Sequence, residues 1–69
     1  MDVDKIGTDA GLVWQALSAA DALGVKQIKK ATKLKKEEIF AALGWLAREG
    51  KVNIAVDPED EKELLVSLA

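Results

Sequence analysis

The sequence predicts a mainly α-helical fold with a small β-hairpin: a three-helix bundle followed by a two-stranded antiparallel wing. Ile39, Leu43 and Leu46 recur at the spacing of a single helical stripe. Gly50 follows at once, and glycine readily takes the left-handed conformation that ends a helix. From Val52 onward the apolar residues alternate with a period of two, which indicates a strand.

The first helix is expected to follow a lead-in of residues 1–7, with Thr8 or Asp9 as its N-cap, because both residue types favour that position. Gly24 is expected to end it. Trp14 lies beside the inward stripe and is expected to be partly buried. The stripe itself is a set with helical spacing: Val13, Ala16, Leu17 and Ala20.

A short second helix is expected over residues 26–32, after a brief extended piece at Val25. Ile28 and Ala31 are spaced three apart and are the predicted inward residues of this helix. The following turn contains Leu34, which is expected to point back into the core.

The third helix is expected from about Lys36 to Glu49, and the hairpin follows it. A polar loop over residues 57–63 is expected to join the two strands, with proline at a favourable turn position. A chain of 69 residues has material for one small core, so residues 1–69 are expected to be a single domain. The strands are predicted from alternating apolar residues: Val52, Ile54 and Val56 on one, and Leu64, Val66 and Leu68 on the other.

Composition excludes several classes of site. Without cysteine or histidine, the chain can form neither disulfides nor a Cys/His zinc site, and no histidine, cysteine or tyrosine is available for catalysis. Ser18 and Ser67 have no base at a suggestive spacing, and the acidic loop lacks the glycine-containing calcium pattern. We therefore expect no enzyme activity, no catalytic or metal-binding residues, no cofactor and no small-molecule substrate.

The localisation expected from the sequence is cytoplasmic. No apolar run is long enough to cross a membrane. The first residues are acidic where a signal peptide needs basic ones.

Charge is distributed unevenly along the chain. The net charge of −2 argues against a strong nucleic-acid binder. Basic residues nevertheless gather between residues 26 and 36, and acidic residues between 57 and 63, so the molecule should have a positive and a negative end.

The stretch I-F-A-A-L-G-W-L-A-R-E-G-K-V, residues 39–52, resembles the third helix and exit of winged helix-turn-helix domains, where V-x-x-x-L-x-x-L-x-x-x-G-x-V is common. Together with A-G-L-V-W-Q-A-L in the first helix, it makes almost the whole chain similar to a small, uncharacterised prokaryotic family of stand-alone winged helix-turn-helix domains. The resemblance implies that fold. The wider superfamily implies DNA binding, mostly in transcription regulators.

In this fold the outward face of the third helix usually enters the major groove. Only Arg48 on that face is well suited to base edges. Trp45 either tucks its edge under the wing or anchors an interface, since tryptophan is enriched at binding hot spots. The expected outer face, which serves as recognition surface or interface, comprises Glu37, Glu38, Ala41, Gly44, Trp45 and Arg48.

The lysine cluster is either a solvated face or a set of DNA phosphate contacts, which position a protein without specifying sequence. The acidic wing tip counts against DNA. The candidate phosphate contacts are Lys26, Lys29, Lys30, Lys33, Lys35 and Lys36, and the wing-tip residues are Asp57, Glu59, Asp60 and Glu61.

Two hypotheses follow. The first is a transcription-regulator-like module that binds double-stranded DNA with weak sequence preference. The second is a protein-interaction module that keeps the fold but has lost base readout, with Ala41, Gly44 and Trp45 as its contact surface. A homodimer is expected in either case, because a small unstapled core gains from further burial. A dimer that buries Trp45 would cover the usual DNA-reading face.

Overall fold

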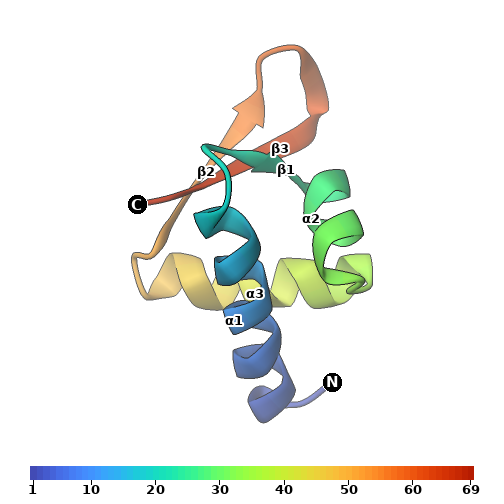
Figure 1. Cartoon of the computed structure of the whole chain (residues 1–69), viewed down its shortest axis with the longest axis vertical. Coiled ribbons are helices and arrows are strands. Elements are labelled where there is room, and N and C mark those ends of the chain that lie inside the picture. The colour runs from blue at the N-terminus through green and yellow to red at the C-terminus, as the bar shows by residue number, and fades with distance from the viewer.

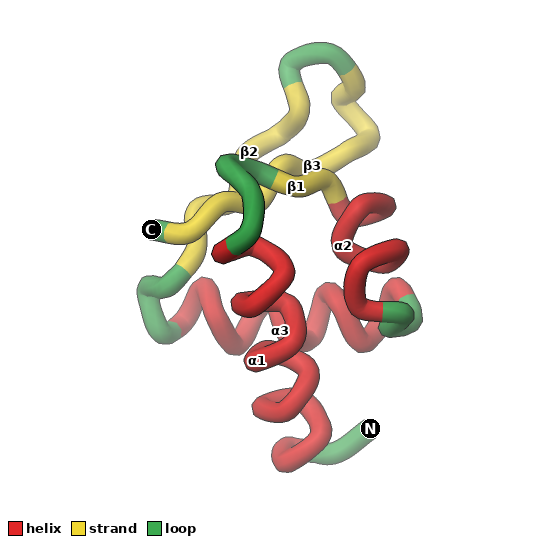
Figure 2. The backbone as a smooth tube through the Cα atoms, in the orientation of Figure 1, coloured by secondary structure: helices red, strands yellow, loops and turns green.

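The computed structural model describes all residues, 1–69. Helix α1 packs across α3, α2 lies beside them, and a sheet closes the bundle (Figure 1). Figure 2 shows the strands gathered at one end of the molecule, with the N-terminus at the other. No helix is both long and apolar enough to cross a membrane. The elements are α1 (Val3–Ser18), β1 (Leu23–Gly24), α2 (Val25–Thr32), α3 (Lys36–Arg48), β2 (Val52–Asp57) and β3 (Asp60–Leu68).

The sheet has three strands rather than the two predicted. Their order is β1-β3-β2, with β3 in the centre and both neighbours antiparallel to it. Leu23 lies opposite Val66, and Gly24 lies opposite Leu65. A two-residue strand is too short to show alternation, which explains why the sequence pattern did not reveal β1. Val25, expected to be extended, is instead the first residue of α2.

The predicted start of the first helix is wrong. Asp2 is the N-cap, and its carboxylate accepts a hydrogen bond from the Lys5 backbone N–H at 2.8 Å. Thr8 and Asp9 lie inside the helix. The Thr8 hydroxyl donates to the Asp4 carbonyl oxygen, and the buried Asp9 carboxylate lies 2.7 Å from the Lys5 ammonium. Both candidate caps therefore have partners within the helix itself.

The predicted end of the first helix is also wrong. The helix stops at Ser18, and the C-cap Ala19 donates its N–H to carbonyl oxygens of the preceding turn. Ala20 lies beyond the helix and is exposed. Gly24 does not end α1 but pairs in β1 and precedes α2 as its N-cap.

The wing is closed by a shorter turn than the predicted loop. Pro58 and Glu59 alone connect β2 to β3, and the Asp57 side chain accepts a hydrogen bond from the Glu59 backbone N–H at 2.9 Å. This Asp-Pro turn closes the hairpin in two residues, because the aspartate side chain supplies a turn hydrogen bond. The acidic residues from Asp60 onward consequently lie on a strand.

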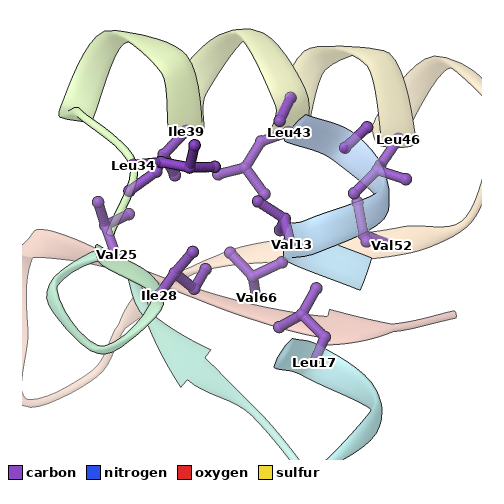
Figure 3. Packing of buried hydrophobic residues seen from close by; sticks show 12 residues of the cluster. Val13, Leu17, Val25, Ile28, Leu34, Ile39, Leu43, Leu46, Val52 and Val66 are labelled. Carbon is purple, nitrogen blue, oxygen red and sulfur yellow. The ribbon is translucent and has the colours of Figure 1, made fainter. Parts of the chain in front are cut away.

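The core receives apolar side chains from all three helices, from the turn before α3 and from the hairpin (Figure 3). The predicted stripe on α3 and the turn residue Leu34 are buried as expected, whereas Ala31 is exposed. Ile54 and Val56 are also exposed, and both lie on β2, which is an edge strand of the sheet. The core comprises Ala10, Val13, Leu17, Val25, Ile28, Leu34, Ile39, Ala42, Leu43, Leu46, Val52 and Val66.

Candidate nucleic-acid interface

The turn between α2 and α3 is built by the backbone of two of the predicted lysines. Lys33 adopts a left-handed conformation with φ of 64°, and its N–H donates to the Lys29 carbonyl oxygen, which ends α2. Lys35 is the N-cap of α3, and its N–H donates to the Glu38 carboxylate at 2.8 Å. The side chains of Lys33 and Lys35 remain exposed.

Four lysines from three elements meet at one hollow. Lys26 and Lys29 come from α2, Lys36 from the first turn of α3 and Lys62 from β3. We call this hollow the basic groove; its volume is about 240 Å³, and it is also lined by Val25, Phe40, Glu63 and Leu64. The fold thus brings together three of the six predicted phosphate contacts and adds Lys62. The other three, Lys30, Lys33 and Lys35, are exposed but do not line the groove.

Glu63 is the one acid that lines the basic groove, and it already has partners. Its Oε1 atom accepts hydrogen bonds from the backbone N–H groups of Val25 at 2.7 Å and Lys26 at 3.3 Å. The carboxylate therefore caps the N-terminus of α2, where a negative charge also suits the helix dipole. Gln27 completes this end by accepting from the Gly24 N–H at 2.8 Å.

Phe40 borders the basic groove from α3, and 41% of its surface is exposed. The Lys36 ammonium lies 5.9 Å from the centre of the Phe40 ring, within the range of a cation–π interaction. The predicted outer face did not include Phe40. Phe40 was left out because it directly follows the core residue Ile39. Consecutive helical residues are nevertheless about 100° apart, which places Phe40 on the flank of the helix.

The opposite flank of α3 carries Trp45, whose ring lies against α1 and not under the wing. A Cβ atom on Gly7 would stand 3.7 Å from that ring. Trp45 and Trp14 expose 38% and 43% of their surfaces and line a second groove with Gly7 and Gly11. We call it the tryptophan groove. Trp45 thus stands apart from the basic groove.

Glu38, predicted on the outer face, is instead bound to α1. Its carboxylate lies 3.1 Å from the Lys5 ammonium, which also pairs with the buried Asp9. The hydrogen bond from the Lys35 N–H, followed by that from Lys5, lowers the pKa of Glu38 below its ordinary value. Hydrogen bonds to Asp9 and then Glu38 raise the pKa of Lys5. This cluster fastens α1 to the start of α3 and leaves fewer residues on the outer face: Glu37, Ala41, Gly44 and Arg48.

The wing-tip acids have local roles in the turn. Asp57 binds the Glu59 N–H, and the Asp60 carboxylate accepts from the Lys62 N–H at 3.0 Å. Glu59 and Glu61 are exposed. Two of the four predicted wing-tip residues therefore help to shape the hairpin.

Comparison with solved structures supports the fold. The solution NMR structure of protein BT2368 from Bacteroides thetaiotaomicron is 34% identical, with a TM-score of 0.83 over 99% of this chain and 79% of that one. A structure on the regulation of DNA binding of Bordetella bronchiseptica BpsR by 6-hydroxynicotinic acid matches at 22% identity and a TM-score of 0.82. It covers 100% of this chain and 52% of BpsR.

A variant of MarR from E. coli, complexed with operator DNA, matches at 19% identity and a TM-score of 0.79, over 100% of this chain and 46% of MarR. The chain thus spans about half the length of these two proteins. No curated protein matches the sequence. A family model described as a winged helix-turn-helix domain (DUF2582) matches residues 1–68. The family predicted from the sequence motifs is confirmed: the chain belongs to this winged helix-turn-helix family.

Proposed function

We propose that the chain is a non-enzymatic, cytoplasmic DNA-binding module of the transcription-regulator type, which contacts duplex phosphates and has weak sequence preference. The observation that supports this most directly is the convergence of Lys26, Lys29, Lys36 and Lys62 on one groove beside α3. Proteins with the same fold include BpsR, whose DNA binding is regulated, and MarR, which is seen on operator DNA.

Weak preference follows from the residues beside the basic groove. Lysine contacts to phosphate fix the position of a protein on DNA but carry no sequence information directly. The outer face of α3 offers one guanidinium, Arg48, in the last turn of the helix. Lys30 lies on α2, and Lys33 and Lys35 lie in the turn between α2 and α3. In this proposal all three extend the phosphate-contacting surface.

Fluorescence anisotropy of a labelled duplex at several salt concentrations tests the proposal. Non-specific binders have dissociation constants of about 10⁻⁴ to 10⁻⁶ M at physiological salt, and each phosphate contact adds about 0.9 to the slope of log K against log salt. Lys36→Gln and Lys62→Gln should each weaken binding and reduce that slope. Lys51→Gln is the matched control for the loss of one positive charge, because Lys51 is an exposed lysine outside the basic groove. Since Lys51 lines the tryptophan groove, sedimentation equilibrium establishes that the oligomeric state of this variant is unchanged. Absence of binding at low salt would refute DNA association.

A homodimer formed through the tryptophan groove is the second part of the proposal. Two large aromatic side chains are exposed there, and an interface is the setting in which tryptophan contributes most to binding. Because Trp45 and Phe40 are five residues apart on α3, they point to different flanks of the helix. The tryptophan groove lies between α1 and α3, whereas the basic groove lies between α2, α3 and β3. Dimerisation there would leave the basic groove open, which removes the conflict expected from the sequence.

Sedimentation equilibrium at tens of micromolar tests the dimer. Trp45→Ala should weaken it more than any lysine substitution. A monomer mass for the unaltered chain, unchanged in the variant, would contradict the proposed interface. A dimer that shows no affinity for DNA at low salt would favour the alternative function, a protein-interaction module.

A further inference from the structure

The basic groove contains an apolar group that phosphate binding does not require. Phe40 stands among four lysines with 41% of its surface exposed. An ammonium group suffices to bind a phosphate, and exposing an aromatic ring to water is unfavourable. The ring is therefore a candidate for contact with a less polar part of the same ligand.

The position of Phe40 on α3 suits contact with bases. It is the fifth residue of the helix, and recognition helices contact base edges chiefly through their N-terminal residues. One turn later stands Gly44, where an added Cβ would meet no atom within 4 Å. Next to Phe40 is the small side chain of Ala41. The surface around the ring is thus low enough for a duplex to approach closely.

We propose that Phe40 contacts thymine methyl groups in the major groove and so gives the module a preference for thymine-containing duplexes. The inference rests on the proposed DNA association. The thymine C5-methyl group is the one apolar feature that base pairs display in the major groove, and phenylalanine is among the side chains that contact it. Lysines of the basic groove position the duplex, and the ring supplies the discrimination that the lysines lack.

Replacing thymine by uracil in one DNA duplex isolates the proposed contact. The substitution removes the methyl group and leaves Watson–Crick pairing and every hydrogen-bonding group in place. Burying one methyl-sized group stabilises by an amount equivalent to about a fourfold change in affinity. The unaltered chain should therefore bind an A·T-rich thymine duplex about fourfold more tightly, per contacted methyl, than its uracil counterpart.

Substitutions of Phe40 test whether its ring causes the difference in affinity between the thymine and uracil duplexes. Phe40→Ala should bind the two duplexes equally, and Phe40→Leu, which keeps an apolar side chain, should retain part of the preference. Leu12→Ala is the matched control, because it removes an equally exposed apolar side chain from α1, outside both grooves, and should leave the ratio unchanged. Circular dichroism melts establish that each variant is folded, and Phe40→Leu serves as the test if Phe40→Ala does not fold.

The outcomes separate this inference from the proposed function. Measurable but equal binding of both duplexes by the unaltered chain overturns the thymine contact and leaves phosphate binding standing. Tighter binding of single strands than of duplexes, with no effect of the methyl group, also overturns it, because Phe40 would then be a stacking platform. Absence of binding to either duplex overturns DNA association, and the inference with it.

Discussion

Gly44→Ala should make the protein more stable and weaken its binding to DNA. Gly44 lies in the interior of α3, and an added Cβ would meet no other atom within 4 Å. Glycine in an exposed helix interior costs about 0.8–1.0 kcal/mol relative to alanine. We therefore expect the free energy of unfolding to rise by about 0.8–1 kcal/mol, which raises the Tm of a domain of this size by about 3–8 °C.

DNA affinity should move in the opposite direction. If a duplex approaches the outer face of α3, the new methyl group holds the helix away from the bases. Urea unfolding, thermal melts and anisotropy on the same samples measure both quantities. Gly11→Ala is the matched control for stability alone: it occupies equally open space in α1 and should also raise the Tm, but Gly11 lines the tryptophan groove, so no DNA affinity is predicted for this variant. Gly50→Ala should destabilise, because φ there is +71°.

Two results would refute this reasoning. A lower Tm for Gly44→Ala would mean that the outer face of α3 is covered within the protein or its dimer. A higher Tm with unchanged DNA affinity would mean that the duplex does not approach Gly44 at all.

Three further outcomes are expected. Glu63→Ala should destabilise by about 1–2 kcal/mol in urea unfolding, because a helix cap is lost. Because its pKa is lowered on folding, the ionised Glu38 stabilises the folded protein at pH values above its ordinary pKa of 4.5. This stabilisation is lost as the pH falls through the pKa of the folded state. Glu38→Gln should therefore reduce the loss of stability at acidic pH, as measured in melts at several pH values. Ile39→Ala should lower the free energy of unfolding by about 2–5 kcal/mol, because the side chain is fully buried. That is a large part of the stability of so small a chain, so calorimetry should show a weakened or absent unfolding transition.

Local patterns predicted the elements whose ends are marked locally. The apolar stripe of α3 and the left-handed Gly50 gave the third helix and its exit to within one residue. The start of α1 was missed because Asp2, Thr8 and Asp9 are all residue types that favour the N-cap; in the structure Asp2 caps the helix, whereas Asp9 pairs with Lys5 inside it. Strand β1 was missed because it exists only by pairing with β3.

Only part of the basic groove was predicted, and the reason is related. The lysines of α2 and the turn are clustered in sequence, so charge alone revealed them. Lys62 is hidden in an acidic run, and Glu63 caps a helix that begins 38 residues earlier. No local signal marks such a contact. Phe40 could have been found, because a helical projection already places it on a flank of α3.

The bond from Val25 to Glu63 has a mechanical consequence. A two-residue turn and an exposed hairpin tip would let the wing swing, but this bond ties β3 to the first turn of α2. The backbone of Lys26 is thereby held beside that of β3 before any ligand arrives, so less backbone freedom remains to be lost on association. A ligand that bridges Lys62 and Lys26 therefore has to order only the two exposed lysine side chains, because the backbone that carries them is already in place.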